Sequence, residues 1–581
     1  MVYILIYWIY ITAISYAIGS FVHSGIRKFC GTRPQDISNF SLVCISGLLT
    51  TLFISTVLCL FIPLAAIASG ILFLIAVLSI LLCYKDFKTQ WSITKSDLKN
   101  TPAVLWFLFL IFVFVFCNMS HQPSSHHDDG LYYSTSVKWL QEYGTVKGLA
   151  NINPRVAFDS SWLILQALYG FSFLHAGLFN HLNGLILLYV LVYAMGGMLK
   201  LIRGDRSLPV LMRSLFILPV LAFHRGASSE WMMFNFNFIE SCTADLPVCL
   251  LIWIIFILFL ESAADASRVF LVLIYSLLAV TIKLSALPIL LLPMFLMLRR
   301  KKIKPVLLYA GIAVLLLSPW IVRNVLLSGY LFFPFSKLDL FQVSWKIPVK
   351  YAILHENAVM VMAADPSQPF GVPFTEPLIQ WFPKWFPKLT VLQAAFFLTT
   401  VAATIVFILA GITSAIRQKK KLVSKYIFHF IFVIAAISGI SLWLFKGPDF
   451  RFGFGFISIY CIFFLSVVLK NIFRKRIRVM GWFAILFTMG IGLFYYSREW
   501  IVFNKLILSP PLPYRMPEEM TDSHFPNGAV IHLVKHADSW NAPLPVANEY
   551  DFNSLQPRML GNSIQDGFYS GDSVSKIFSG N

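Results

Sequence analysis

Residues 102–133 read PAVLWFLFLIFVFVFCNMSHQPSSHHDDGLYY, and this stretch shows what kind of chain it belongs to. Its first half, Pro102–Cys117, is an unbroken apolar run, whereas its second half is a polar loop with paired histidines and paired aspartates. A helix that crosses a membrane needs about 20 predominantly apolar residues. We therefore expect a membrane-spanning helix here, followed by a polar loop at the membrane surface.

Apolar runs of the same kind recur from the N-terminus to residue 496. The runs are Tyr3–Phe21, Ser41–Ile62, Leu64–Tyr84, Pro102–Cys117, Leu182–Leu201, Leu208–Phe223, Ala244–Leu260, Val269–Ile282, Ala286–Leu298, Pro305–Val322, Leu389–Ile416, Tyr426–Phe445, Phe452–Leu469 and Val479–Tyr496. The sequence therefore predicts an all-α polytopic transmembrane protein with about 14 spans. The first run lacks the basic start and the small-residue cleavage site of a signal peptide, so we expect it to be retained as a span.

The composition excludes a soluble or disordered protein. Of the 581 residues, 58% are hydrophobic and 13% are charged, whereas soluble domains carry about 25% charged residues. The mean hydropathy is +0.74. The eight cysteines lie mostly in or beside apolar runs and form no CxxC pair, which excludes a disulfide framework and a cysteine zinc site.

The net charge of +19 indicates an orientation in the membrane. If the spans alternate, one side receives all the basic clusters, which are Arg27–Arg33, Lys85–Lys99, Lys200–Arg213, Arg299–Lys304, Arg417–Lys425 and Lys470–Arg478. That side holds 27 Lys and Arg against 6 Asp and Glu, and the other side holds 19 against 21. Because basic loops stay in the cytoplasm, we expect both termini on the extracytoplasmic side and no nucleic-acid partner. A bacterial inner membrane is the expected location, although an ER membrane would give the same bias.

Four extracytoplasmic segments are too long to be simple connectors. They cover residues 119–181, 224–243 and 323–388, and the tail from residue 497. We expect a transmembrane domain at residues 1–496 and a small mixed cap at residues 497–581, because the tail has ordinary polarity and apolar pieces such as Ala529–Val534. Within 323–388, Gln380–Lys388 (QWFPKWFPK) carries the Trp and Lys residues that anchor at headgroup level.

Acidic residues mark two points on the extracytoplasmic side. Asp128 and Asp129 follow His126 and His127 in the first loop, where a carboxylate can accept a proton from a hydroxyl and His with Asp can hold a divalent ion. Asp245 lies at the mouth of a later span, shortly after Glu240, and an ionisable group there is a functional candidate. A solvated polar loop and an acidic helix start explain the same residues without a function.

Basic residues on this otherwise acidic side form the third feature. They are Lys283, Arg323 and Arg451. Their side chains suit a phosphate, although snorkelling to the interface or a structural ion pair would also place them there. The chain has no Walker A loop, convincing GxGxxG or HExxH motif, which argues against a nucleotide-driven pump.

At the level of whole motifs, the chain resembles the GT-C class of membrane glycosyltransferases. That class combines many spans, a long first outer loop with an acidic pair, a second acid at a later helix mouth and basic residues for a lipid phosphate. The chain is also similar to a family of bacterial polytopic membrane proteins in the motifs Asp128–Tyr133, Gly148–Asn151, Ser160–Trp162, Thr281–Ser285, Pro448–Gly453, Trp540–Pro545 and Asp566–Phe568. In that family two cysteines flank the motif at Trp540–Pro545, whereas this chain has Ser539 and Val546 there.

The resemblance implies an inverting transfer of a hexosyl or pentosyl group. The donor would be a sugar linked to a polyprenyl phosphate, and the acceptor a hydroxyl of a glycan, a lipid or a protein outside the membrane. Asp128 or Asp129 would be the general base, and Asp245 with Glu240 would position the acceptor. Some members of the class require a divalent ion such as Mg²⁺ or Mn²⁺.

The resemblance also suggests roles for the remaining candidates. The residues that would bind the carrier phosphate are Lys283, Arg323 and Arg451. The aromatic residues that could stack on sugar faces are Tyr132, Tyr133 and Trp162. The candidate ligands of a divalent ion are His126, His127 and Asp128.

Two other functions fit a protein of this class. An O-antigen polymerase or ligase would depend on Arg and His, so that replacing both Asp128 and Asp129 by Asn would leave it active. A transporter or flippase for a lipid-linked sugar would favour inverted repeats and charges at the membrane midplane. The sequence has no visible repeat, and its candidate charges gather at one face.

Overall fold

The computed structural model describes most of the chain. The described residues are 1–32, 39–174, 180–215, 238–263, 265–299, 303–365, 367–368, 373–416, 420–473, 475–503, 512–536 and 538–571. The outer segment 224–243 therefore lies outside the described residues up to 237, and so does the apolar run Leu208–Phe223 beyond Leu215.

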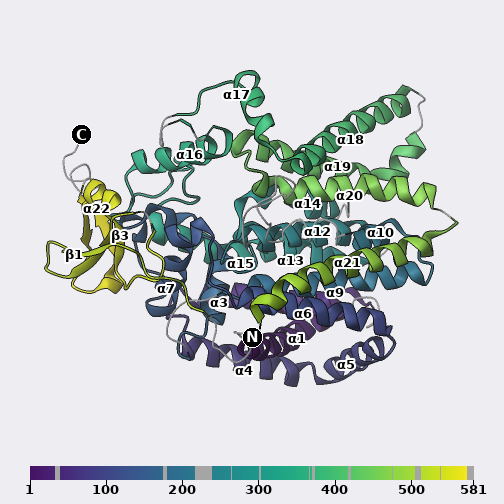
Figure 1. Ribbon diagram of the computed structural model, residues 1–581, viewed down its shortest axis with the longest axis horizontal. Coiled ribbons are helices and arrows are strands. Elements are labelled where there is room, and N and C mark those ends of the chain that lie inside the picture. The colour runs from purple at the N-terminus through teal and green to yellow at the C-terminus, as the bar shows by residue number, and fades with distance from the viewer. Residues whose placement is uncertain are drawn as a thin grey trace.

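Helices dominate the fold, and every apolar run contains helix in its described part (Figure 1). The helices built on these runs are α1 (Val2–Cys30), α3 (Phe40–Leu58), α4 (Ala66–Leu82), α6 (Ala103–Ser120), α9 (Leu182–Ile202), α10 (Leu208–Leu215), α12 (Asp245–Glu261), α13 (Ala266–Ile282), η4 (Leu284–Leu290), α14 (Leu291–Leu298), α15 (Ile303–Ser328), α18 (Val391–Ile416), α19 (Lys420–Lys446), α20 (Phe450–Ile472) and α21 (Ile477–Phe503).

Nine helices in the described ranges are long and apolar enough to cross a membrane. They are α1, α3, α6, α9, α15, α18, α19, α20 and α21. A tenth candidate is α4 taken with the following helix α5 (Tyr84–Lys99), and these two axes are bent by 92°. The chain thus has the apolar helices of an integral membrane protein, while the total of about 14 spans stays a prediction.

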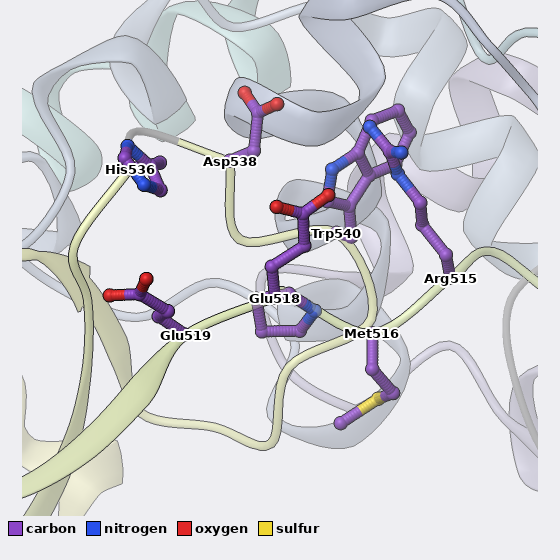
Figure 2. Close-up of a pocket in the computed structure, with 8 residues that line it drawn as sticks. Arg515, Met516, Glu518, Glu519, His536, Asp538 and Trp540 are labelled. Carbon is purple, nitrogen blue, oxygen red and sulfur yellow. The ribbon is translucent and has the colours of Figure 1, made fainter.

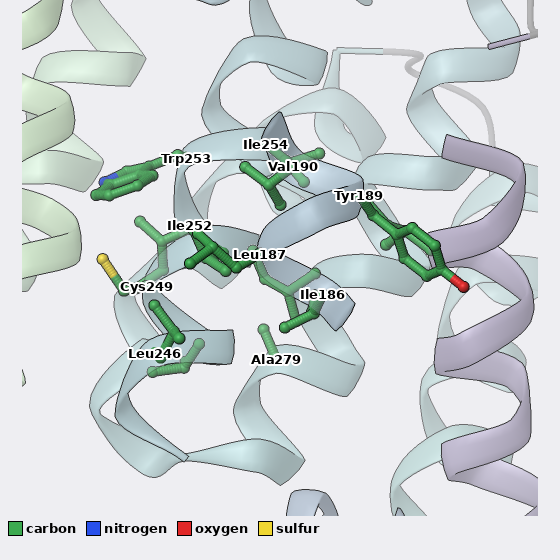
Figure 3. Packing of buried hydrophobic residues seen from close by; sticks show 14 of the residues in the cluster. Ile186, Leu187, Tyr189, Val190, Leu246, Cys249, Ile252, Trp253, Ile254 and Ala279 are labelled. Atoms are coloured by element: carbon green, nitrogen blue, oxygen red, sulfur yellow. The ribbon is translucent and has the colours of Figure 1, made fainter. Parts of the chain in front are cut away.

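Helix α12 forms the centre of the bundle. Its residues from Asp245 to Leu260 are all buried, and a helix that is apolar on every side belongs in an interior. Figure 3 shows Ile252 of α12 among side chains of α9, such as Leu187. Trp253 fixes the contact with α20, because its indole N–H lies 2.7 Å from Ser458 Oγ.

Helices α1 and α3 approach each other closely through small residues. A Cβ atom on Gly47 would collide with the backbone of Ser15, and one on Gly19 would collide with the backbone of Val43. Small residues allow membrane helices to pack backbone against backbone. This pair therefore anchors the N-terminal part of the bundle.

The long segments predicted outside the membrane contain helices of their own. The first holds η1 (Asp129–Tyr133), α7 (Ser134–Glu142), η2 (Leu149–Asn151), η3 (Pro154–Ala157) and α8 (Ser161–Tyr169). The later segment holds α16 (Val349–Ala364), α17 (Leu378–Trp385) and η5 (Phe386–Lys388). All residues of α8 are buried, so the first segment is part of the protein interior.

Two small sheets and a short helix form the last described part of the chain, where the sequence predicts a small mixed cap. Strand β1 (Met520–His524) pairs antiparallel with β2 (Val530–Val534), which pairs in parallel with β3 (Val546–Asn548). Helix α22 (Glu549–Leu555) follows, then β4 (Pro557–Met559) pairs antiparallel with β5 (Phe568–Ser570). We call residues 512–571 the cap, and they lie at one end of the helix bundle (Figure 1).

The cap and the first outer segment share one hydrophobic core. Ile531 and Phe568 of the cap cluster with Trp139 and Leu149 of the first segment. The division at residues 496 and 497 falls inside α21, which continues to Phe503. The cap therefore packs against the first outer segment, although in the chain it follows α21.

Candidate functional site

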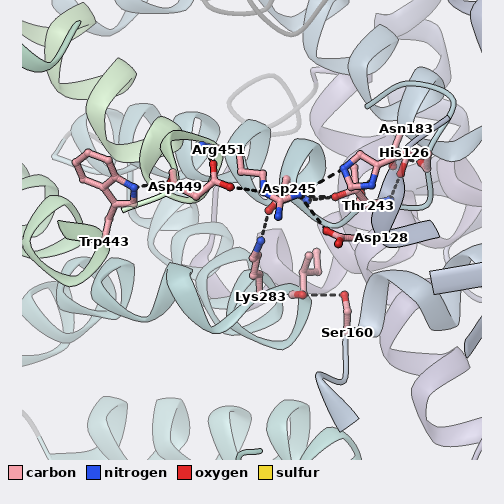
Figure 4. A network of polar contacts seen from close by, with 12 residues as sticks. His126, Asp128, Ser160, Asn183, Thr243, Asp245, Lys283, Trp443, Asp449 and Arg451 are labelled. Carbon is pink, nitrogen blue, oxygen red and sulfur yellow. Dashed lines mark hydrogen bonds and ion pairs between the residues drawn. The ribbon is translucent and has the colours of Figure 1, made fainter. Parts of the chain in front are cut away.

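Charged side chains from four separate segments meet at the cap end of the bundle (Figure 4). Arg451 Nη1 lies 3.0 Å from Asp128 Oδ2 and 4.0 Å from Asp245 Oδ2. The Arg451 Nε atom lies 2.9 Å from Asp449 Oδ2, and Lys283 forms an ion pair with Asp245. We call Asp128, Asp245, Lys283, Asp449 and Arg451 the charge cluster.

Helix ends position the members of the charge cluster. Asp245 is the first residue of α12, and Asp449 caps α20 by accepting a hydrogen bond from the Arg451 backbone N–H at 3.1 Å. Lys283 stands between α13 and η4 in extended backbone, with φ −156°. Its ammonium nitrogen lies 3.9 Å from the centre of the Phe452 ring, a favourable cation–π distance.

The charge cluster is close to neutral overall. Its three carboxylates exceed its two cations by one charge. The N-termini of α12 and α20 adjoin the carboxylates, and each terminus acts roughly as half a positive charge. Helix dipoles therefore offset the excess, which explains how three carboxylates can gather here.

The paired aspartates occupy opposite environments. The Asp128 side chain is 19% exposed and faces Arg451. Asp129 is completely buried, and its carboxylate accepts hydrogen bonds from Ser241 Oγ at 3.0 Å, the Cys242 N–H at 3.2 Å and Tyr514 OH at 3.2 Å. Burial raises the pKa of Asp129 to about 7. Asp129 therefore ties three segments together, whereas Asp128 is partly exposed and paired with Arg451.

The two histidines point in different directions. His126 is buried, and its Nε2 atom lies 3.5 Å from Arg451 Nη1. Burial lowers the pKa of His126 to about 4, so the ring is neutral at pH 7. His127 is 64% exposed, and its Nδ1 atom lies 3.8 Å from Asp538 of the cap.

These placements do not fit the expected metal ligands. Asp128 is occupied by Arg451, and His127 faces the cap instead of His126. Among the residues that the structure describes, no three His, Cys, Asp or Glu side chains are grouped so as to hold a metal ion. We therefore derive no chemical step through a metal.

Two of the predicted site residues are held elsewhere by buried partners. Arg323 is buried in α15 and forms an ion pair with Asp159, so its guanidinium is already paired with a carboxylate that is not a member of the charge cluster. Trp162 is fully buried, and its indole N–H donates to Asn183 Oδ1 at 2.8 Å. The Trp162 ring therefore offers no face to a sugar.

The other predicted residues lie beside the charge cluster. Tyr132 is partly buried and Tyr133 buried, with ring centroids 4.3 Å apart, and Tyr133 stacks on His126. Glu240 is buried two residues before Cys242, whose backbone binds Asp129. Of the two tyrosines, Tyr132 is the less buried.

Several contributors were not recognised as site residues from the sequence. Asp449 lies inside the motif Pro448–Gly453, two residues before Arg451, and this short spacing is the sequence feature that could have indicated their pairing. Asn183 holds the segment before α12 through its Nδ2 atom, 2.7 Å from Phe238 O and 2.9 Å from Ser241 O. Tyr514 donates a hydrogen bond to Asp129 from a distant part of the chain, and the local sequence around Tyr514 does not predict this contact.

The tail motif packs directly on the acidic pair. The Ser539 and Trp540 backbone N–H groups donate to Gly130 O at 2.8 and 3.2 Å, and Ser134 Oγ donates to Trp540 O at 2.7 Å. Ser539 Oγ also lies 2.5 Å from Thr135 Oγ1. Hydrogen bonds thus hold the cap at Ser539 and Trp540, and all eight cysteines of this chain are free.

A cavity of about 330 Å³ opens in the cap beside this contact (Figure 2). The lining residues are Arg515, Met516, Pro517, Glu518, Glu519, His536, Asp538 and Trp540. The Arg515 guanidinium lies 4.3 Å from the centre of the Trp540 ring. Five of the lining residues carry ionisable side chains, and Trp540, which also lines the cavity, donates its backbone N–H to Gly130 O.

A family model described as a domain of unknown function, DUF8201, matches residues 1–458. The chain belongs to this family. The DUF8201 region contains the whole charge cluster and ends within α20, so the cap lies after it. Comparison with curated proteins and with solved structures gave no match.

Proposed function

We propose that this protein is a membrane glycosyltransferase that moves a sugar from a lipid-phosphate carrier to an acceptor hydroxyl. The observation that supports this most is the placement of a partly exposed carboxylate, Asp128, beside Arg451 and Lys283 in one cluster. A base next to two phosphate-binding cations is the arrangement that such a transfer needs. It also agrees with the GT-C resemblance of the sequence.

In this proposal Asp128 is the general base. Its carboxylate takes the proton from the acceptor hydroxyl as that oxygen attacks the anomeric carbon. The bond between the anomeric carbon and the phosphate oxygen breaks, and the polyprenyl phosphate leaves. The configuration at the anomeric carbon is inverted, because the attack comes from the face opposite the leaving group.

Arg451 and Lys283 bind the leaving phosphate. Both are held by carboxylates in the free protein, so the phosphate competes for their N–H groups with Asp128, Asp449 and Asp245. Asp449 is the most exposed of the three, at 31% of its side chain. Preorganised cations stabilise the charge that develops on the phosphate.

We further propose that the cap end is the extracytoplasmic face of a bacterial inner membrane and that about 14 helical segments are embedded. The support is the charge distribution, since the loops predicted opposite the cap hold 27 Lys and Arg against 6 Asp and Glu. Both termini and the charge cluster then lie on the extracytoplasmic side.

The test is sugar transfer by the purified protein in detergent. A panel of radiolabelled polyprenyl-phosphate sugars is supplied with a mixed glycan and lipid acceptor pool, and the labelled product is counted. We expect product with the native protein and its loss in Asp128→Asn. Asp522→Asn is the matched control, because Asp522 is an exposed carboxylate of the cap whose ion pair with His532 involves no residue of the charge cluster.

The other outcomes point to the alternative functions. Product that persists in Asp128→Asn would contradict the assigned base and favour a polymerase or ligase that works through Arg and His. Absence of product, together with saturable carrier binding that Lys283→Gln abolishes, would favour a flippase.

A further inference from the structure

Helix α5 leaves the bundle at a sharp angle immediately after α4. The two axes differ by 92°, and only Cys83 separates the helices. Leu78, Leu81 and Leu82 at the end of α4 are exposed and apolar, as expected of a helix that meets lipid. If α4 crosses the membrane, α5 lies close to the membrane plane.

One side of α5 is fixed to helix α1. Gln90 and Thr94 are buried, and Thr94 Oγ1 lies 2.9 Å from Tyr16 OH. Asp86 adds an ion pair with Arg27 at 3.3 Å. These contacts fix the rotation of α5 and determine which residues face outward.

The outward side of α5 carries an apolar stripe next to a basic one. Tyr84, Trp91 and Leu98 are 59%, 47% and 40% exposed, and their spacing of seven residues places them on one line along the helix. Lys88 and Lys95 follow Tyr84 and Trp91 by four residues, so they lie beside that line. Lys85 and Lys99 extend the basic side, and both are exposed.

We infer that α5 is an interfacial helix that binds the headgroups of anionic phospholipids. The apolar stripe continues the lipid-facing surface of α4, from Leu81 and Leu82 to Tyr84. Aromatic side chains prefer the headgroup level, and lysines beside them attract negative lipid. Figure 1 shows α5 at the end of the bundle away from the cap, where the other basic loops are predicted.

The lipid is the occupant that these observations favour over a protein partner. The exposed apolar residues form a single narrow stripe instead of a broad patch, which suits shallow insertion at a membrane surface. Helix α5 contains four lysines and only two acidic residues. One of the acidic residues, Asp86, is paired with Arg27 of α1. The outward surface is therefore basic.

Photo-crosslinking in nanodiscs tests the inference. The full-length protein carries a benzophenone amino acid in place of exposed Ser92, and the nanodiscs contain phosphatidylcholine with an equal part of phosphatidylglycerol. Either lipid is radiolabelled in turn. We expect crosslinks mainly to phosphatidylglycerol, and a loss of about fivefold for each lysine removed in Lys88→Gln and in Lys88→Gln with Lys95→Gln.

Lys337→Gln with Lys350→Gln is the matched control, because both lysines are exposed but lie far from α5 in the chain. This control should leave the crosslinking unchanged, and its elution as a single species confirms intact protein. Equal crosslinking to both lipids, or a yield that the α5 lysines do not affect, would overturn the inference. Crosslinks to protein alone would overturn it as well.

Discussion

Asp128 and Asp129 are neighbours in the chain with different physical situations. Asp128 faces Arg451 and is partly exposed, whereas Asp129 is fully buried among hydrogen-bond donors. A general base must reach the acceptor hydroxyl, and Asp129 is enclosed on all sides by protein. The structure therefore directs the proposed chemistry to Asp128 and a structural role to Asp129.

This difference gives the first prediction. Asp128→Asn should lower the rate of sugar transfer by about 10²–10⁴-fold, because a general base contributes that much. Asp129→Asn should keep most of the activity, since an amide oxygen can still accept the Ser241 and Cys242 hydrogen bonds. Initial rates of both variants at saturating donor are the measurement, and equal losses would contradict the division of roles.

The raised pKa of Asp129 predicts a pH dependence of stability. Burial raises its pKa from 3.8 to about 7, so between these values the folded protein binds a proton more tightly than the unfolded chain. This contribution to the free energy of unfolding is complete below pH 3.8 and is lost as the pH rises to about 7. Comparing the apparent Tm of the native protein and Asp129→Asn across this window isolates the effect. A pH slope that the substitution leaves unchanged would contradict the assignment.

Metal removal tests the ligand set. Arg451 and Lys283 supply the positive charge in our proposal, and His126, His127 and Asp128 do not converge. We therefore expect EDTA to leave the transfer rate unchanged. Activity that disappears with EDTA and returns with Mg²⁺ or Mn²⁺ would show that the ligands rearrange around an ion.

Sequence reasoning found the charged residues of the site better than it found their partners. The sequence predicts Asp128 from the acidic pair in the first loop and Asp245 from its position at the mouth of a span. It predicts Lys283 and Arg451 as basic residues on an otherwise acidic side, and the structure brings all four together. Arg323 is predicted for the same reason as Lys283 and Arg451, but it pairs with Asp159, which is remote from it in sequence. The burial of Trp162 could not be predicted either, because the local sequence around an aromatic residue in an outer loop does not show whether the ring is exposed or packed. The chemical roles of the cluster remain predictions.

At the scale of elements, the contact between Gly130 and Trp540 joins the acidic pair to the cap. A Cβ atom on Gly130 would lie 2.6 Å from Trp540 Cε2, so Gly130→Ala must displace the indole or the loop. We expect a loss of about 1–3 kcal/mol in stability, a lower apparent Tm and faster tryptic cleavage of the cap.

Gly311→Ala provides the comparison for this variant. Gly311 lies in helix α15, and a Cβ atom there would meet nothing within 4 Å. That substitution should leave the cleavage rate unchanged and should not lower the Tm, because alanine favours a helix more than glycine does. An unchanged cap in Gly130→Ala would contradict the proposed docking of the tail motif.

Helices were predicted from the apolar runs, but a change of direction was not. The run Leu64–Tyr84 ends at a 92° bend, and Lys85–Lys99, which the sequence suggests is a basic loop, forms helix α5. The hydrophobicity of a run predicts which residues avoid water, but it does not predict the angle between successive helices. The same limit applies to α8, whose burial depends on α3, α7 and α13 packing around it.

At the scale of the whole molecule, the cap is integrated with the first outer segment. The sequence suggests a separate tail, because its composition changes after residue 496. The structure instead places Phe568 and Ile531 of the cap in one core with Trp139, and Tyr514 on Asp129. Such long-range contacts leave no local pattern in a single sequence.

The sidedness of sugar transfer tests the central claim most directly. The protein is reconstituted into sealed vesicles, its orientation is determined by protease access to the cap, and a membrane-impermeant acceptor is supplied on one side at a time. We predict labelled product only when the acceptor is on the side of the cap, and none with Asp128→Asn on either side. Product formed with the acceptor on the side of the basic loops, or product that survives Asp128→Asn, would contradict the account.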